Sequence, residues 1–272
     1  MLLNEFSPAV AEGFLQGRQS MSAEEQLRTY FRTLYAAWGR QHWWPAESPF
    51  EVIVGAYLTQ NTSWTNVERA LKNLREARLL SASGIRRTPL RKLEKLIRPS
   101  GYFRQKAQRL KTFVDFLDQN YGGSLARMFS QPTSKLRDEL LSLNGVGPET
   151  ADSILLYAGD HPSFVVDTYT RRILERHHLI DASATYDEIR ELFDRALRPL
   201  TQEILERPSS AASGPGNSCH SPTKMSAARR EADVQIFNEM HGLIVGVAKN
   251  YCKKSQTDCE HCPLKKFLPA SK

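Results

Sequence analysis

Apolar side chains recur at helical spacing along most of the chain. In the first such stretch Leu27, Phe31 and Trp38 fall on one face of a helix that begins at Ala23, and Gly39 follows as a stop signal. The same spacing predicts further helices over 50–58, 64–74, 90–97, 103–117, 134–143, 149–158, 168–177 and 186–197, and one more that begins at 232. The pattern therefore predicts a mostly helical protein.

Strand character is confined to the short stretch 163–166, Ser-Phe-Val-Val. No strands alternate with helices in the βαβ manner, so the predicted fold class is all-α. No apolar run approaches the roughly 18 residues that a membrane-spanning helix needs, so we expect no membrane partner. The N-terminus has no basic region followed by an apolar one, which favours a cytoplasmic over a secreted protein.

Two segments lack this periodic pattern. Residues 206–231 include a run rich in Ser, Gly and Pro with almost no large apolar side chain, which predicts a flexible insertion. Residues 1–22 are mixed in composition and only weakly periodic, which predicts a flexible tail. Ordered structure is therefore expected over 23–205 and 232–272.

Charge and cysteine usage narrow the function classes. The 272 residues include 37 Lys and Arg against 30 Asp and Glu, a formal net charge of +7, which permits a polyanionic partner. Hydrophobic residues make up 40% of the chain, so wholesale disorder is excluded. Three of the four cysteines lie together near the C-terminus, which is more typical of a metal site in a reducing cytoplasm than of a disulfide framework.

A glycine-rich turn joins two of the predicted helices. The helices over 134–143 and 149–158 flank the sequence Asn-Gly-Val-Gly-Pro, in which Gly145 and Gly147 can adopt positive φ and leave backbone N–H groups uncovered. Together with the N-terminus of the second helix, these groups can bind a DNA phosphate without reading sequence. The pattern predicts a helix-hairpin-helix with Thr150 in its DNA-binding turn, although an ordinary glycine turn between packed helices fits it too.

The segment that follows the hairpin contains an aspartate. Asp167 comes 18 residues after Glu149, at a place where a helix N-cap would be its plain role. The two segments together, LNGVGPETADSILLYA and FVVDTYTRRIL, resemble the helix-hairpin-helix, Gly/Pro and Asp signature of the endonuclease III superfamily of DNA glycosylases. The resemblance implies a base excision repair enzyme whose partner is double-stranded DNA containing damaged bases.

The resemblance also implies how the chain is organised. It implies a helical barrel over 48–160, which contains the hairpin at 134–158, packed on a second helical domain. That second domain would consist of residues 23–47, 161–205 and 232–272. The active site would lie in the cleft between the two domains, and we expect the protein to act as a monomer.

The chemistry implied by the resemblance centres on Asp167. Loss of the base builds oxocarbenium charge on the sugar, which a nearby carboxylate stabilises, and the same carboxylate can orient or deprotonate the attacking water. Members of the superfamily that also cut the strand carry a lysine where this chain has Glu149. Because Glu149 cannot form a Schiff base, the resemblance implies a monofunctional glycosylase without efficient lyase activity. A solvated acid in the first turn of a helix is the plain alternative for Glu149.

A cluster of tryptophans indicates where a base could bind. Trp43, Trp44 and Pro45 form a loop, and Trp64 follows the polar segment that contains Gln60. A base that leaves the DNA stack needs aromatic faces to hold it, although indoles are more often core or surface anchors. The loop, Trp64 and the hairpin acid resemble the 3-methyladenine DNA glycosylase branch, in which two aromatic side chains sandwich the flipped base and the Gln enters the gap in the duplex.

The branch implies alkylated, positively charged purines such as 3-methyladenine as substrates. A cationic base is a good leaving group and is attracted to indole faces by cation–π interaction. The 3-methyladenine branch lacks the C-terminal cysteines that this chain carries. A glycosylase for oxidised pyrimidines or mismatched bases is therefore a second hypothesis, and a DNA-binding relative without catalysis is a third.

Basic residues are dense between positions 86 and 111. This stretch holds ten Lys and Arg and one acid, Glu94. Most such runs are solvated faces, but in the superfamily this region lies near DNA. The candidates for phosphate contact are Arg86, Arg87, Arg91, Arg104 and Lys106.

The C-terminal cysteines follow a motif of the superfamily. Cys252, Cys259 and Cys262 match the first three ligands of a C-x6-C-x2-C-x5-C iron–sulfur motif, and the fourth position is Leu268. The resemblance implies a [4Fe–4S] cluster whose missing ligand comes from Cys219, His261 or a non-protein molecule. A metal-free remnant of the motif is the alternative, and the six-residue gap disfavours zinc.

Overall fold

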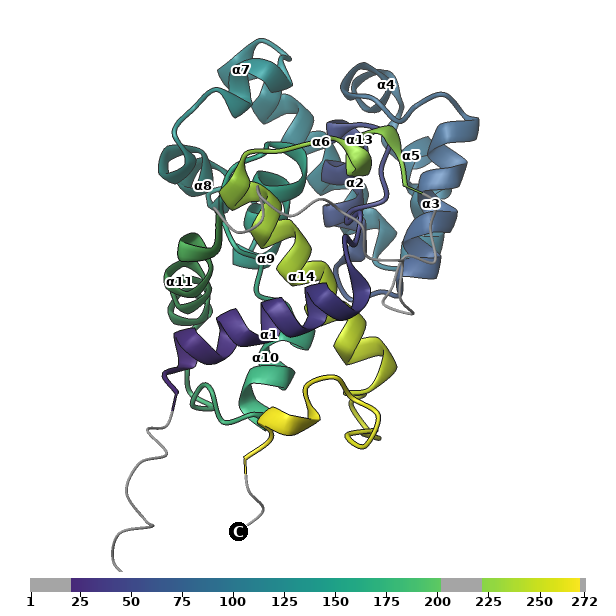
Figure 1. The fold of residues 1–272 in the computed structure, drawn as a ribbon. Coiled ribbons are helices and arrows are strands. Elements are labelled where there is room, and N and C mark those ends of the chain that lie inside the picture. The colour runs from purple at the N-terminus through teal and green to yellow at the C-terminus, as the bar shows by residue number, and fades with distance from the viewer. Residues whose placement is uncertain (1–20, 202–221, 270–272) are drawn as a thin grey trace, which may run out of the picture.

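Residues 21–201 and 222–269 are described by the structure, which is a computed structural model (Figure 1). Its α-helices are α1 (Ala23–Trp38), α2 (Pro49–Thr59), α3 (Trp64–Glu76), α4 (Ala82–Arg87), α5 (Leu90–Ile97), α6 (Phe103–Tyr121), α7 (Leu125–Phe129), α8 (Thr133–Leu141), α9 (Pro148–Ser153), α10 (Thr168–Arg176), α11 (Tyr186–Leu197), α13 (Lys224–Ala227) and α14 (Ala232–Asn250). Short η segments are η2 (Arg98–Ser100), η3 (Ile154–Ala158), η4 (Arg198–Leu200) and η5 (Lys265–Phe267). The predicted all-α fold class is confirmed.

Local capping determines where several helices begin. Ser22 and Glu25 form a capping box at the start of α1, and Thr185 and Glu188 form another at the start of α11. Gly39 ends α1 with a φ of 64°, a conformation that glycine adopts without a steric penalty. These signals lie within a few residues of the helix ends, so the sequence predicted both starts correctly.

The predicted strand at 163–166 is wrong. No strand occurs among the described residues, and this segment runs extended and buried into α10 without a partner strand. The Phe164 ring stacks flat on the Phe193 ring, with 3.9 Å between centroids and 9° between planes. Burial against other side chains, rather than strand pairing, therefore explains why these positions are apolar.

The structure also differs from the sequence prediction at three short helices, α4, α7 and α13. The last of these lies inside the segment predicted as a flexible insertion. Residues 222–231 are instead fixed to the rest of the protein, because Thr223 Oγ1 donates to the Ala46 carbonyl at 2.7 Å and Arg40 Nη2 donates to the Ala228 carbonyl at 2.7 Å. The rest of the predicted insertion, and the predicted tail except for Met21 and Ser22, lie outside the described residues.

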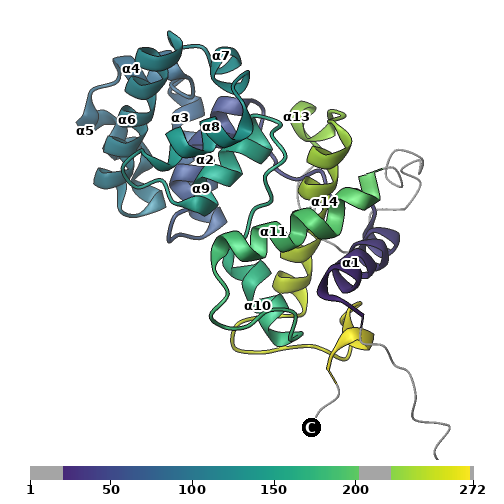
Figure 2. The ribbon, with the colours of Figure 1, turned by 90° about the vertical axis from the view of Figure 1, so that its left-hand side faces the viewer.

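The helices gather in two groups. Figure 2 shows α2 to α9 on one side, and α1, α10, α11 and α14 on the other. Helix α14 packs against α10 in its own group and against η3 at the end of the hairpin, so it borders both groups. The predicted domain bounds stay a prediction. None of the described helices combines the length and the hydrophobicity needed to span a lipid bilayer.

Candidate active site

Asp167 is the N-cap of α10 and lies where the two groups of helices meet. Its Oδ1 accepts hydrogen bonds from the Thr170 backbone N–H at 2.7 Å and from the Thr170 hydroxyl at 2.9 Å. The side chain keeps 13% of its surface exposed. Asp167 therefore fills the plain capping role, while a small part of the carboxylate stays open to an incoming group.

His241 faces the other oxygen of Asp167. Its Nε2 lies 3.5 Å from Asp167 Oδ2, and its Nδ1 lies 2.5 Å from the hydroxyl of Tyr157. The side chain is buried, with 5% of its surface exposed. His241 could not be assigned to the site from the sequence, because a single histidine on the apolar face of a predicted helix does not indicate which residues pack against it.

The two carboxyl groups of the site have pKa values displaced in opposite directions. Burial by itself raises the pKa of Asp167, but the facing His241 and the hydrogen bonds from Thr170 outweigh it and lower that pKa below its usual value. Part of the Glu149 side chain is exposed. Its pKa is nevertheless raised to about 6, mainly because atoms packed around the carboxyl remove water and secondly because Asp167 is negatively charged. Two acids with separated pKa values are suited to different steps of an acid–base reaction.

The tryptophans predicted to form a pocket do lie together. The Trp44 ring is buried and meets the Trp64 ring edge-on, at 5.1 Å between centroids and 84° between planes. It also contacts the Tyr157 ring at 5.4 Å. Because Trp44 and Trp64 are nearly perpendicular, they do not themselves form a parallel sandwich. Pro45 follows in the same loop and is half-buried.

Trp43 connects this aromatic cluster to α14. Its ring lies 6.0 Å from the ring of His241, and the ammonium of Lys249 lies 5.7 Å from its centroid. The loop approaches the helix closely at Gly242, where an added Cβ would lie 2.9 Å from the Cβ of Gln41 and 3.3 Å from the Cβ of Trp43. The aromatic cluster and the carboxylate of Asp167 therefore share His241 as a neighbour.

The hairpin glycines have different surroundings. Gly145 has a φ of 79°, and an added Cβ would collide with the side chain of Arg109. Gly147 has open space on its Cβ side, with no other atom within 4 Å of that position. The turn therefore needs glycine at 145 for its backbone, and it leaves room at 147 for a phosphate to approach.

Gln60 and Thr150, both predicted to bind DNA, are hydrogen-bonded to each other. The Gln60 amide donates to the Gly145 carbonyl at 2.9 Å and to the Thr150 hydroxyl at 3.0 Å, and its oxygen accepts from Arg109 at 2.7 Å. The Thr150 side chain is buried, and the role of this residue in DNA binding stays a prediction. Its hydroxyl accepts from Gln60 and so helps to hold Gln60 against the hairpin. Gln60 could enter a duplex only if its hydrogen bonds to Gly145, Thr150 and Arg109 broke.

The basic stretch does not act as one surface. Lys106 is buried and its ammonium donates to the carbonyls of Leu58 at 2.9 Å and Ser100 at 2.7 Å, so its predicted phosphate contact is wrong. It joins the C-terminal ends of α2 and η2. Arg86 pairs with Asp118. Arg104 is exposed beside the Phe103 ring, and its contact with DNA stays a prediction.

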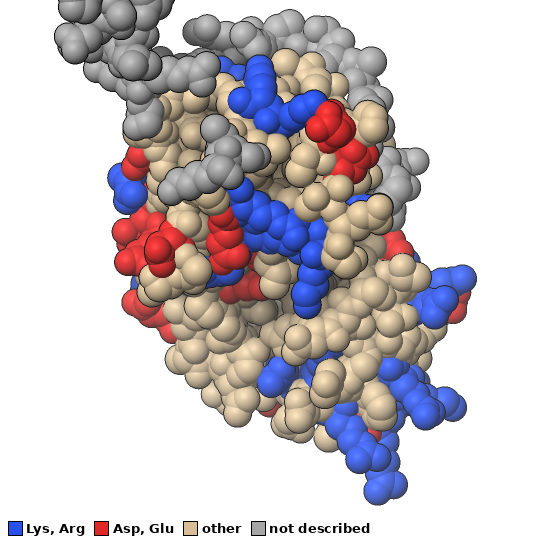
Figure 3. Space-filling view, turned by 90° about the horizontal axis from the view of Figure 1, so that it is seen from below, with Lys and Arg blue, Asp and Glu red and all other residues tan. Residues whose placement is uncertain are grey.

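Positive charge is unevenly spread on the face that carries α10 and the C-terminal segment. Figure 3 shows Lys and Arg side chains in a central band and along one edge, while Asp and Glu gather at the opposite edge. Such a separation of charge favours one orientation of a polyanion on this face.

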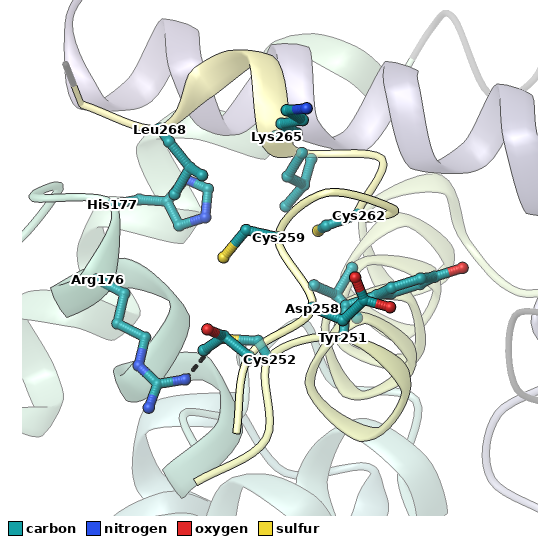
Figure 4. Close-up of a pocket in the computed structure, with 12 residues that line it drawn as sticks. Arg176, His177, Tyr251, Cys252, Asp258, Cys259, Cys262, Lys265 and Leu268 are labelled. Atoms are coloured by element: carbon teal, nitrogen blue, oxygen red, sulfur yellow. Dashed lines mark hydrogen bonds between the residues drawn. The ribbon is translucent and has the colours of Figure 1, made fainter. Parts of the chain in front are cut away.

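The three C-terminal cysteines line one hollow that is partly open to solvent. Figure 4 shows the sulfur of Cys259 pointing into it, and Leu268, at the fourth position of the motif, beside His177. Arg176 Nη1, at the end of α10, donates to Cys252 Sγ at 3.1 Å and to the Lys253 carbonyl at 2.8 Å. Of the proposed fourth ligands, His261 is 79% exposed and pairs with Asp258, and Cys219 lies outside the described residues.

The described residues do not form a site for a single metal ion. Within residues 21–201 and 222–269, no three His, Cys, Asp or Glu side chains are close enough together to bind one metal ion. A single zinc would need its thiolates about 2.3 Å away on all sides, whereas a cluster brings its own iron and sulfide and spaces its ligands further apart. The three thiols that line the hollow are one short of the four that a [4Fe–4S] cluster takes, and Leu268 stands at the fourth position of the motif.

Comparison with known proteins decides the family. Residues 54–199 match the family described as HhH-GPD superfamily base excision DNA repair protein. The chain belongs to the HhH-GPD superfamily. A relative in Methanocaldococcus jannaschii, provisionally named a DNA repair glycosylase, is 42% identical over 89% of this chain and 96% of its own. Endonuclease III of Thermotoga maritima is 30% identical over 80% of this chain and 81% of its own.

Solved structures give the same fold for this HhH-GPD protein. The Helicobacter pylori 3-methyladenine DNA glycosylase bound to 1,N6-ethenoadenine is 27% identical, covers 84% of this chain and 98% of its own, and superposes with a TM-score of 0.66. An endonuclease III–DNA complex has a TM-score of 0.67 at 21% identity, over 91% of this chain and 96% of its own. The predicted resemblance to the endonuclease III superfamily is confirmed, and the chain is a DNA glycosylase of that superfamily.

Proposed function

We propose that this HhH-GPD protein is a monofunctional glycosylase that releases alkylated purines from double-stranded DNA. The observation that carries the proposal is the aromatic cluster of Trp43, Trp44 and Trp64 beside Asp167. A flipped purine offers two large faces, and indole rings supply the stacking that holds it out of the duplex. The H. pylori relative, which binds 1,N6-ethenoadenine, supports a purine in the pocket.

Within this proposal the two carboxyls divide the work. Asp167 stays ionised because its pKa is low, so it stabilises the positive charge that develops on the sugar as the base leaves. Glu149, with a pKa of about 6, is ionised at neutral pH and can accept the proton of the attacking water. Since Glu149 has no amine, it forms no Schiff base, and strand cleavage is left to another enzyme.

Lys249 adds a condition on the charge of the substrate. Its ammonium already lies against the Trp43 ring, so a cationic base in the same place would be repelled. We therefore place the charged edge of an alkylated purine toward Trp64. Neutral alkylated purines such as 1,N6-ethenoadenine meet no such repulsion.

The C-terminal cysteines complete the proposal. We propose that Cys252, Cys259 and Cys262 hold a [4Fe–4S] cluster, which ties the C-terminal loop to the end of α10. Iron and sulfide content, visible absorbance and electron paramagnetic resonance of anaerobically purified protein would test it. A folded protein without iron, after anaerobic reconstitution, would favour the metal-free remnant.

A base-release assay tests the substrate. Duplexes carrying 3-methyladenine, 1,N6-ethenoadenine, hypoxanthine, thymine glycol, or thymine opposite guanine are incubated with excess enzyme, and the freed base is measured by chromatography. The proposal expects release of alkylated purines, with strand breaks only after heat or alkali. Release of thymine glycol or thymine alone would support the second hypothesis. A covalent adduct trapped by borohydride would contradict the monofunctional assignment.

A further inference from the structure

The two oxygens of Asp167 have unequal partners. Both hydrogen bonds that the structure shows for this carboxylate end on Oδ1 and come from Thr170. Oδ2 faces His241 Nε2 across 3.5 Å, which exceeds the usual N–H···O length of 2.7–3.2 Å. One half of the carboxylate is therefore fixed by its own helix, and the other half is free to respond to a neighbour from α14.

The proton on His241 can be assigned from Tyr157. Tyr157 is completely buried and burial raises its pKa far above the usual value, so its hydroxyl keeps its proton and donates to His241 Nδ1. Nε2 carries a hydrogen both in the neutral imidazole that accepts at Nδ1 and in the imidazolium, so it is a donor in either form. This Nε2 is buried and has no hydrogen-bond partner among the described residues, while the carboxylate of Asp167 lies directly before it.

Aromatic rings fix the imidazole in this position. The rings of Tyr157, Trp43 and Phe164 lie 5.8, 6.0 and 6.2 Å from that of His241, from three different segments of the chain. Phe164 is in turn stacked on Phe193. His241 has little freedom to turn away, so a small shift between α10 and α14 is enough to close the gap to Asp167.

We propose that His241 is a positioning residue, whose Nε2–H donates to Asp167 Oδ2 when damaged DNA is bound and holds the carboxylate toward the sugar. Hydrogen bonds of catalytic groups are often long in the free protein and shorten in the substrate complex. With Oδ1 held by Thr170 and Oδ2 held by His241, the carboxylate can no longer rotate. The remaining lone pairs then face the reacting sugar and its water.

The test rests on the proposed function, because it measures base release. His241→Phe keeps the ring volume but removes the donor, and we expect single-turnover base release about tenfold to a hundredfold slower, with unchanged affinity for the damaged duplex. His241→Gln, which can place an amide N–H near the Nε2 position, should recover most of the rate. His161→Phe is the matched control, since His161 is a buried histidine that contacts Thr133 and the Phe129 carbonyl instead.

A titration of Asp167 separates positioning from a general loss of structure. Nuclear magnetic resonance follows the signal of the Asp167 carboxyl carbon as the pH is lowered. The signal is assigned because it is missing from the spectrum of Asp167→Asn. The charged or titratable groups around His241 are Asp167, Tyr157, Glu149, Arg230 and Lys249. His241→Phe should raise the titration midpoint of Asp167, because burial then acts unopposed by the histidine.

The outcomes decide between the two proposals. An unchanged titration midpoint, or an unchanged rate in His241→Phe, would overturn the role of His241 while leaving the proposed function intact. If the wild type releases no base from any duplex, the proposed function fails and the titration alone decides the role of His241. If His241→Phe does not fold, Tyr157→Phe carries the test, and we expect a loss of a few fold because the hydrogen on the imidazole is no longer directed to Nε2.

Discussion

The two ends of α10 carry two different sites. At its N-terminus Asp167 is held by Thr170 and faces a buried histidine, so side chains from separate helices determine its geometry and charge. At its C-terminus Arg176 holds a loop whose three cysteines surround an open hollow with a leucine at the fourth position. We propose that the first end serves the chemistry and the second attaches the C-terminal loop. Substitutions near Asp167 should therefore change the rate of base release, and substitutions of the cysteines should change iron content and absorbance.

The largest effect is expected at Asp167. Asp167→Asn keeps the acceptor for the Thr170 N–H but loses the charge that opposes the oxocarbenium ion, so base release should slow about a hundredfold to a thousandfold. Affinity for the damaged duplex should persist, measured by fluorescence anisotropy. Asp181→Asn, at an exposed carboxylate that caps a turn at Ser183, is the control and should retain the wild-type rate. Near-wild-type turnover of Asp167→Asn would show that this end of α10 takes no part in the chemistry.

The next effect is expected in the aromatic cluster. Trp64→Ala removes the ring that meets Trp44 edge-on, and loss of stacking on one base is worth about 1–3 kcal/mol, so base release should fall about tenfold to a hundredfold. Trp64→Phe should retain most of the rate because it keeps an aromatic face. Single-turnover kinetics on 1,N6-ethenoadenine duplexes would measure both. Equal rates for the alanine variant and the wild type would show that the base binds elsewhere.

A smaller effect on chemistry is expected at the cysteine end. Cys259→Ala should lose the iron and the visible absorbance of the cluster. Base release by freshly purified protein at low temperature should stay within about threefold, since the loop is bonded to α10 through Arg172 and Arg176, downstream of Asp167. Leu268→Cys should make the cluster more resistant to air. A Cys259→Ala variant that folds and binds DNA but releases no base would contradict the division between the two ends.

The smallest effect concerns stability. The pKa of Glu149 is raised from 4.5 to about 6 on folding, so the folded state favours the protonated acid and loses relative stability as the pH rises from 4.5 to 6. Glu149→Gln should therefore stabilise the protein above pH 6, by about 1 kcal/mol or less after solvent screening, and have no effect below pH 4.5. Urea unfolding at both pH values would measure it. Glu175→Gln, in the last turn of α10, is the control and should change the free energy of unfolding by the same small amount at both pH values.

Much of the fold and part of the site could be predicted from the sequence. The bounds of α5 and α11 agree with the predicted ranges, because apolar periodicity and capping are local signals. Asp167 and the tryptophans could be identified from motifs. The structure places Trp43 beside His241, which faces Asp167, and the roles of these residues stay a prediction.

The remaining site residues depend on contacts between distant segments. Lys106 and Gln60 are polar side chains in a basic or polar stretch, and only the folded chain shows that one binds two helix ends and the other binds the hairpin. His241 likewise meets Asp167 across 74 residues of sequence, because α14 packs on α10. Periodicity reports which face of a helix is buried, but it does not report the partner.

The contact between the two ends of the chain has a consequence for synthesis on the ribosome. Helix α1 packs on α11 and α14, and Gln26 donates to the carbonyl of Phe267 at 3.3 Å. Helix α1 therefore has no helical partner among those two until α11, which ends at Leu197, has emerged. The helices α2 to α9 can meet their own neighbours much earlier. We expect nascent chains to assemble the hairpin group first, and α1 to remain a target for chaperones until α11 has emerged.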